Sequence, residues 1–195
     1  MLKSLVLQMI ALHSYDELKI MLITDESDKD EWDFIRPIQH FWNDDKTMRF
    51  FASNADEVKE LSAYMEKNLV SRTDAPHQDY ADLSPYYVII STSEKLAENC
   101  EAIQQLLKFK NNRGFSILLS GRDLRDLPKE TKLVISACGE NSKMFARDDT
   151  SGQSVVFKAD TVNEAIIGGL AQDIANIELD LGSKHYALPS MITFL

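Results

Sequence analysis

The chain has 195 residues, a formal net charge of −10 and an isoelectric point near 4.8. One substantial hydrophobic core fits this length, and the acidic balance opposes binding to DNA or RNA, because affinity for a phosphate backbone comes mainly from lysine and arginine. No apolar run approaches the ~20 residues of a membrane helix, so we expect no direct membrane insertion by this chain.

The first predicted element is a helix over residues 2–12 that is apolar almost all round. Such a helix is expected to be buried. Because it begins without a capping residue, we expect the chain to be part of a longer polypeptide. The helix positions expected to tolerate water are Lys3, Ser4 and Gln8. After this helix, a strand is predicted over residues 18–24.

Residues 25–33 carry six acidic side chains and one lysine, Lys29. A Ca²⁺-binding loop alternates its ligands in a similar way, but the glycine of its sharp bend and its terminal bidentate glutamate are missing here. We therefore favour a solvated acidic loop over a calcium site.

The segment of residues 32–42 is too aromatic, and too interrupted by Pro37, for a regular surface helix. Two interpretations stay open. In one, the segment binds a partner protein; in the other, which we favour, it packs on the edge of the sheet. The candidate interaction residues of the first interpretation are Trp32, Phe34, Arg36 and Trp42.

Residues 48–52 predict a short strand, and Asn54 is placed to cap the helix that follows it. Residues 71–83 are polar and predict the main surface loop. The apolar stripe of the helix between them consists of Val58, Leu61, Met65 and Leu69.

Residues 85–93 form an apolar, β-branched and aromatic run that predicts the buried central strand of an α/β domain. In a P-loop NTPase this strand ends in one or two acids that hold the Mg²⁺ of the nucleotide. Here it ends in Ser91, Thr92 and Ser93, whose hydroxyls supply neither the charge nor the basicity that hydrolysis needs. Ser91 and Thr92 are thus degenerate cofactor-binding positions, and we expect an ATPase-shaped domain without ATP hydrolysis.

Strands and helices continue to alternate after this run, which indicates an α/β fold with a mainly parallel central sheet covered on both faces, as in three-layer RecA-like (P-loop NTPase-like) domains. We expect residues 1–185 to form this degenerate ATPase-like domain and residues 186–195 to begin a linker to the next module. The later predicted elements are a helix with Leu96, Cys100, Ile103 and Leu107 on one face, buried strands over residues 115–119 and 132–136, a hairpin of residues 143–146 and 154–158, and a last helix opened by a capping box of Thr161 and Glu164.

Metal and thiol chemistry have little support in the sequence. Cys100 and Cys138 lack metal-binding spacing and are interpreted as two buried thiols, and the histidines are scattered, so we expect no metal. Gly168 and Gly169 lie inside a helical pattern, which indicates close helix packing and not a phosphate loop.

Arg122 and Arg125 lie in the loop between the strands of residues 115–119 and 132–136. They act in trans at a subunit or domain boundary in one interpretation. In the other, which we favour, they pair with the nearby Asp123 and Asp126.

Four stretches carry a family resemblance: residues 2–20, 32–45, 119–128 (LSGRDLRDLP) and 188–195 (LPSMITFL). They resemble segments of the FtsK/SpoIIIE-type ATPases of type VII secretion systems, the EssC/EccC family of Gram-positive bacteria. The first stretch looks like the segment that follows the phosphate loop. The match spans the chain and points to the first, divergent ATPase-like domain, between the membrane helices and the motor modules.

The resemblance implies a parent protein that is a membrane-anchored, oligomeric motor, uses Mg-ATP and exports WXG100-type proteins. This chain departs from the active modules because it has no G-x-x-x-x-G-K-[ST] motif, unless one lies upstream of Met1. We therefore expect a non-catalytic domain that couples or positions the ATPase modules at the cytoplasmic face of the cell membrane. No cofactor is expected in this chain.

The partners implied by the resemblance are the neighbouring ATPase modules, other secretion-machine subunits and a second copy of the chain. Two alternatives remain: a weakly active Mg-ATP-binding domain of the same motor, and a free-standing cytosolic adaptor unrelated to secretion.

Overall fold

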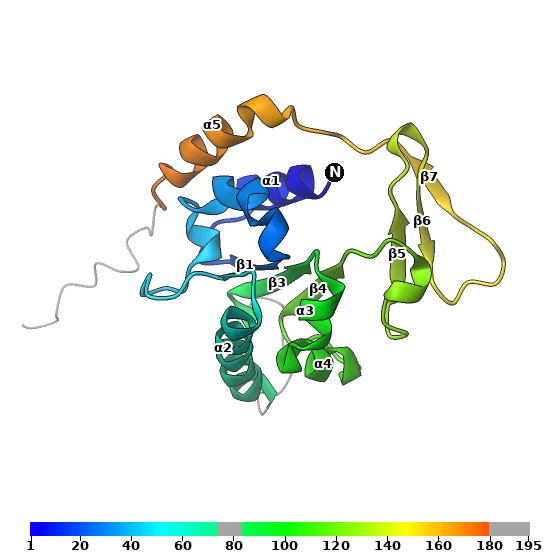
Figure 1. The fold of residues 1–195 in the computed structure, drawn as a ribbon, viewed down its shortest axis with the longest axis horizontal. Coiled ribbons are helices and arrows are strands. Elements are labelled where there is room, and N and C mark those ends of the chain that lie inside the picture. Colours follow the sequence, from blue (N-terminus) through cyan, green and yellow to red (C-terminus); the bar gives the residue numbers. More distant parts are fainter. Residues whose placement is uncertain (74–82, 180–195) are drawn as a thin grey trace, which may run out of the picture.

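The computed structural model describes residues 1–73 and 83–179. Its centre is a four-stranded parallel sheet in the order β2-β1-β3-β4 (Figure 1). β1 (Leu18–Ile23) and β3 (Tyr86–Ser91) pair along their whole length. β4 (Phe115–Leu119) lies on the other side of β3, and the short β2 (Phe51–Ala52) on the outer side of β1. The predicted central strand is confirmed, since β3 has a strand on each side.

Helices cover both faces of the sheet, and each face has its own hydrophobic cluster (Figure 1). Met21 and Ile23 of β1 belong to one cluster, and Ile20 and Leu22 to the other. Burial on both faces explains the unbroken apolar run of β1 and confirms the three-layer α/β fold class. One face is covered by α2 (Ala55–Thr73), α3 (Glu94–Glu98) and α4 (Glu101–Lys108), the other by α1 (Leu2–Leu12), η1 (Glu26–Ile35), η2 (Gln39–Phe41) and α5 (Glu164–Ala175).

Helix α2 forms as predicted but continues to Thr73, into the residues predicted as the start of the surface loop. Asn54 Oδ1 accepts hydrogen bonds from the backbone N–H groups of Asp56 and Glu57, at 3.1 and 3.0 Å, and so caps the helix. The predicted strand over residues 48–52 is shorter, because Arg49 forms an isolated bridge with Trp42 and only Phe51–Ala52 pairs with β1. The predicted apolar stripe is buried as expected: Val58, Leu61, Met65 and Leu69.

Two other helix predictions need correction. Helix α1 is less buried than predicted: Leu12 is exposed, whereas Lys3 is half-buried and pairs with Glu31 and Glu164. The single helix predicted around Leu96 and Ile103 is two helices, α3 and α4. The break occurs because the buried Cys100 adopts an extended backbone at the N-cap of α4.

A separate antiparallel sheet consists of β5 (Leu133–Ser136), β6 (Ser142–Ala146) and β7 (Val155–Phe157), in that order. The predicted hairpin is confirmed as β6 and β7. The prediction of a buried strand over residues 132–136 is wrong: Leu133 and Ile135 of β5 are 54% and 41% exposed. Only the other face of β5, with Val134, is buried, which is typical of a half-covered antiparallel sheet.

Helix α5 differs from its prediction in its cap and its packing. Asn163, not Thr161, is the N-cap, and its side chain accepts a hydrogen bond from the backbone N–H of Ala165. The prediction of close helix packing at Gly168 and Gly169 is also wrong. A Cβ at either position would have no atom of another described element within 4 Å. The exposed glycines lie on the side of α5 away from the core, which α5 contacts through Ile167 and Ala171 instead.

Cys100 and Cys138 are both free thiols; Cys100 is buried as predicted, whereas Cys138 is exposed. Within residues 1–73 and 83–179, no helix combines the length and apolarity needed to cross a membrane. Most of the predicted surface loop and the predicted linker over residues 186–195 lie outside the described residues.

Arg72, near the end of α2, binds the segments that lead into β3 and β4. Its guanidinium donates hydrogen bonds to the carbonyl groups of Pro85, Arg113 and Gly114, and it stacks over the rings of Tyr87 and Phe115. Gly114 adopts φ +79°, and a Cβ there would lie 2.1 Å from Arg72 Nη1. The position thus excludes a side chain for both backbone and packing reasons.

We predict that Gly114→Ala lowers the free energy of unfolding by about 2–3 kcal/mol, because the new methyl group strains the backbone and displaces Arg72 from its hydrogen bonds. Gly152→Ala is the matched control, since Gly152 also has positive φ but open space around it; it should cost only about 1 kcal/mol. Urea denaturation measures both. Equal losses in the two variants would contradict the role of Arg72.

His40, in η2, is buried against Tyr15, and its Nε2 lies 2.8 Å from the carbonyl oxygen of His13. Nε2 therefore donates, and the buried Nδ1 has no hydrogen-bond partner in the described part of the chain. A second proton would fall on Nδ1. Burial, aided by the positive charge of the nearby Lys19, holds the pKa of His40 below its ordinary value.

Because the folded pKa of His40 is lowered, the unfolded chain binds the proton more tightly, and stability falls as the pH drops below about 6.5. We predict that His40→Phe flattens this loss of unfolding free energy between pH 7 and pH 5. His13→Gln is the control: it keeps the carbonyl that accepts from His40 and removes only a minor effect on the pKa of His40, so its slope should change less than that of His40→Phe. An unchanged slope in His40→Phe would show that other groups cause the acid sensitivity.

Candidate functional site

The carboxyl ends of the four parallel strands meet along one edge of the sheet. Thr24 follows β1, Ser53 follows β2, Ser91 ends β3 and Ser120 follows β4. Ligands of open parallel α/β sheets bind outside this edge. The edge therefore carries the candidate site, and its chemistry is dominated by hydroxyl groups.

The two positions singled out in the sequence, Ser91 and Thr92, use their hydroxyls inside the protein. Ser91 is 1% exposed, and its Oγ donates to the carbonyl oxygen of Ser93 at 2.8 Å. Thr92 Oγ1 donates to Thr24 Oγ1, also at 2.8 Å. The end of β3 thus offers no negative charge, and its hydroxyl protons are already donated within the fold.

Asp25 is a member of this edge that sequence reasoning missed. Its Oδ1 accepts a hydrogen bond of 2.6 Å from Ser93 Oγ, which also accepts from the backbone N–H of Leu96 and caps α3. In the sequence, Asp25 is the first residue of the acidic segment over residues 25–33. The signal that identifies it is its place after the predicted strand of residues 18–24, which pairs with β3.

The acidic side chains are exposed, as predicted for a solvated acidic loop, but the segment forms the 3-10 helix η1 and not a loop. Glu26 pairs with Lys29 and accepts from Ser53 Oγ, and these two hydrogen bonds lower its pKa, with the larger effect from Lys29. Within the described residues, no three His, Cys, Asp or Glu side chains are grouped so that they could hold a metal ion.

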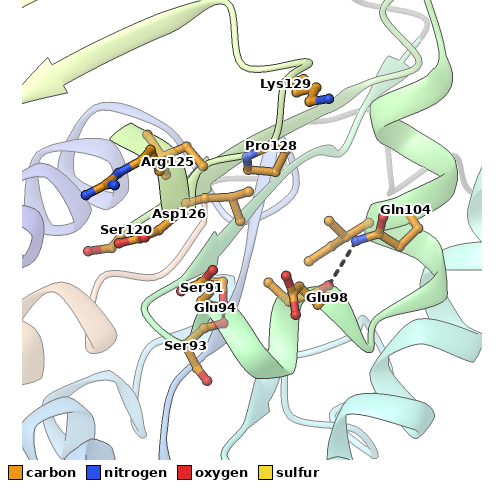
Figure 2. Close-up of a pocket in the computed structure, with 14 residues that line it drawn as sticks. Ser91, Ser93, Glu94, Glu98, Gln104, Ser120, Arg125, Asp126, Pro128 and Lys129 are labelled. Carbon is orange, nitrogen blue, oxygen red and sulfur yellow. Dashed lines mark hydrogen bonds between the residues drawn. The ribbon is translucent and has the colours of Figure 1, made fainter. Parts of the chain in front are cut away.

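A groove of about 260 Å³ lies beyond the ends of β3 and β4 (Figure 2). Helix α3 forms one wall with Glu94 and Glu98, and the loop around η4 (Leu124–Asp126) forms the other with Arg125 and Lys129. The lining between them is mixed: its polar residues are Ser91, Ser93, Gln104 and Ser120, and its apolar residues are Ala97, Ile103, Leu119, Leu127 and Pro128.

Arg125 pairs with Asp123, with 3.2 Å between Nη2 and Oδ2, as the favoured interpretation predicted. This contact raises the pKa of Arg125 and lowers that of Asp123. Asp126 instead accepts from the backbone N–H groups of Arg122 and Asp123, which completes a capping box. Of the two predicted arginines, Arg125 lines the groove and Arg122 does not.

The aromatic segment lies apart from the groove, since none of its residues lines it. Trp32 is 4% exposed and stacks on the half-buried Phe34, which agrees with the packing interpretation. The exposed Arg36 pairs with Asp33, and Trp42 Nε1 donates to the carbonyl oxygen of Arg36. A partner role for Phe34, Arg36 and Trp42 stays a prediction.

No protein-family model matches the chain. Over 194 residues it is 18% identical to the ESX secretion system protein EccC of Geobacillus thermodenitrificans (strain NG80-2). The alignment covers 100% of this chain but only 13% of that protein. The chain is thus a distant relative of one short part of a much longer secretion protein.

We predict that Ser93→Ala lowers the free energy of unfolding by about 1–2 kcal/mol, because it removes the cap of α3 and the bond to Asp25. Ser120→Ala, at the end of the neighbouring strand, is the control; no hydrogen bond of its side chain is found in the described chain, so its effect should stay within about 0.5 kcal/mol. Thermal denaturation followed by circular dichroism compares the two. Equal effects would contradict the capping role.

Proposed function

We propose that this chain is a non-catalytic, ATPase-like domain of a type VII protein secretion motor. In this role it couples or positions the ATPase modules during export of WXG100-type proteins. The distant similarity to EccC along the whole chain supports the family, and the parallel sheet supports an ATPase-like shape.

The observation that carries the non-catalytic part is the end of β3. Hydrolysis of ATP needs an acid to hold Mg²⁺ and a group that orients the attacking water. Ser91, Thr92 and Ser93 occupy that position, and all three hydroxyls donate to other groups of the protein. The hydroxyls of this strand end therefore bond within the protein and supply no negative charge of their own to a metal.

The domain would act by contact with its neighbours at the cytoplasmic face of the cell membrane. The partners we propose are the ATPase modules of the same motor, other subunits of the secretion machine and a second copy of the chain. Mg-ATP would be bound by the motor modules of the longer protein and not by this domain.

Asp25 favours one rival, a weakly active Mg-ATP-binding domain. Its exposed carboxylate lies at the carboxyl edge and accepts from Ser93, so it is placed to contact a metal-bound water if a phosphate-binding segment were supplied. The rival therefore predicts nucleotide binding that depends on Asp25.

Calorimetric titration of Mg-ATP separates the two functions. We expect no binding heat, no thermal stabilisation and no phosphate release, either from the 195-residue chain or from a version extended upstream of Met1. Saturable binding that is weakened by Asp25→Asn, together with measurable turnover, would overturn the non-catalytic assignment. Asp28→Asn, a change of the same charge on η1, serves as the control.

A further inference from the structure

The groove beside α3 has both apolar and charged side chains in its lining. Some of these charged side chains have ion-pair or hydrogen-bond partners in the protein, and others have none among the described residues. The apolar surface that the groove offers to a ligand belongs mainly to the half-buried Leu119, Leu127 and Pro128, because Ala97 and Ile103 are only 5% and 0% exposed. On the rim, Arg125 is paired with Asp123, and the carboxylate of Asp126 accepts two backbone N–H groups. These two charges have their partners within the loop.

Glu94 and Glu98 are different. Both are exposed, and no ion pair joins either carboxylate to a cation of the described chain. They stand four residues apart on α3, where like charges face the same side and repel each other. Figure 2 shows Lys129 on the opposite side of the groove from both. The α3 wall of the groove is therefore negative and has no ion-pair partner among the described residues, and Lys129 across the groove has none either.

The size of the groove restricts what fits. Sites for whole drug-sized ligands occupy roughly 300–1,000 Å³, whereas this groove measures about 260 Å³. That space holds one or two side chains. The combination of apolar lining and unpaired carboxylates selects a side chain with an apolar neighbour and a positive charge.

We infer that this groove binds a peptide segment of a neighbouring protein that presents an arginine or lysine side chain next to an apolar one. The apolar side chain packs on Leu119, Leu127 and Pro128, and the cation lies between Glu94 and Glu98. This inference rests on the proposed function, because it specifies the contact through which a positioning domain holds its neighbour.

The test uses the ¹⁵N-labelled 195-residue chain and the peptide acetyl-Leu-Arg-Leu-amide, followed by amide chemical shifts. We expect shifts confined to residues 93–104 and 119–129, and affinity about five-fold higher than for the same peptide with glutamine or glutamate at the centre. Equal affinity for the three peptides, or shifts located elsewhere, would overturn the inference.

Glu94→Gln combined with Glu98→Gln should remove the preference for the arginine peptide while the rest of the spectrum stays folded. Glu60→Gln combined with Glu178→Gln also removes two negative charges, but at exposed positions outside the groove, and should keep the preference for the arginine peptide. Loss of preference in both variants would mean that only the net charge matters, which contradicts a built site. ATP turnover would refute the proposed function but not this peptide result, so the two failures are distinguishable.

Discussion

The parallel pairing of β1 with β3 is the constraint on which the rest of the molecule depends. The two strands pair over six residues, and their side chains project alternately into the two hydrophobic clusters. A sheet buried on both sides requires helices on both faces, so the positions of α1, α2 and α5 follow from it. The same pairing brings the ends of separate strands together, and so places Asp25 beside Ser93 and Thr24 beside Thr92.

The chemistry of this edge reflects the cost of burying charge. An acid at the end of β3 would lose its hydration unless a metal or a cation compensated for it. Ser91 is fully enclosed and instead satisfies its hydroxyl with the backbone of Ser93. Internal hydrogen bonds of this kind stabilise the strand ends without any ligand. The end of β3 is therefore held to the end of β1 by contacts of the protein itself.

Local patterns predicted the parts of the fold that depend on nearby residues: the runs of β1 and β3, the stripe of α2 and its Asn54 cap. They failed where tertiary packing decides, since the β-prone run at Leu133 joins a half-exposed sheet and Gly169 meets no neighbour. For the candidate site, the sequence located the hydroxyls of Ser91 and Thr92. It did not locate the groove, because its walls, α3 and the η4 loop, are about thirty residues apart and meet only through the order of β3 and β4.

The small sheet of β5, β6 and β7 shares no residue with either hydrophobic cluster of the described chain. Arg147 ties it to the loop before it by donating to the carbonyl groups of Leu127 and Pro128. Pro128 therefore belongs both to the outer wall of the groove and to the contact that holds the small sheet, so a shift of this sheet relative to the parallel sheet would change the shape of the groove.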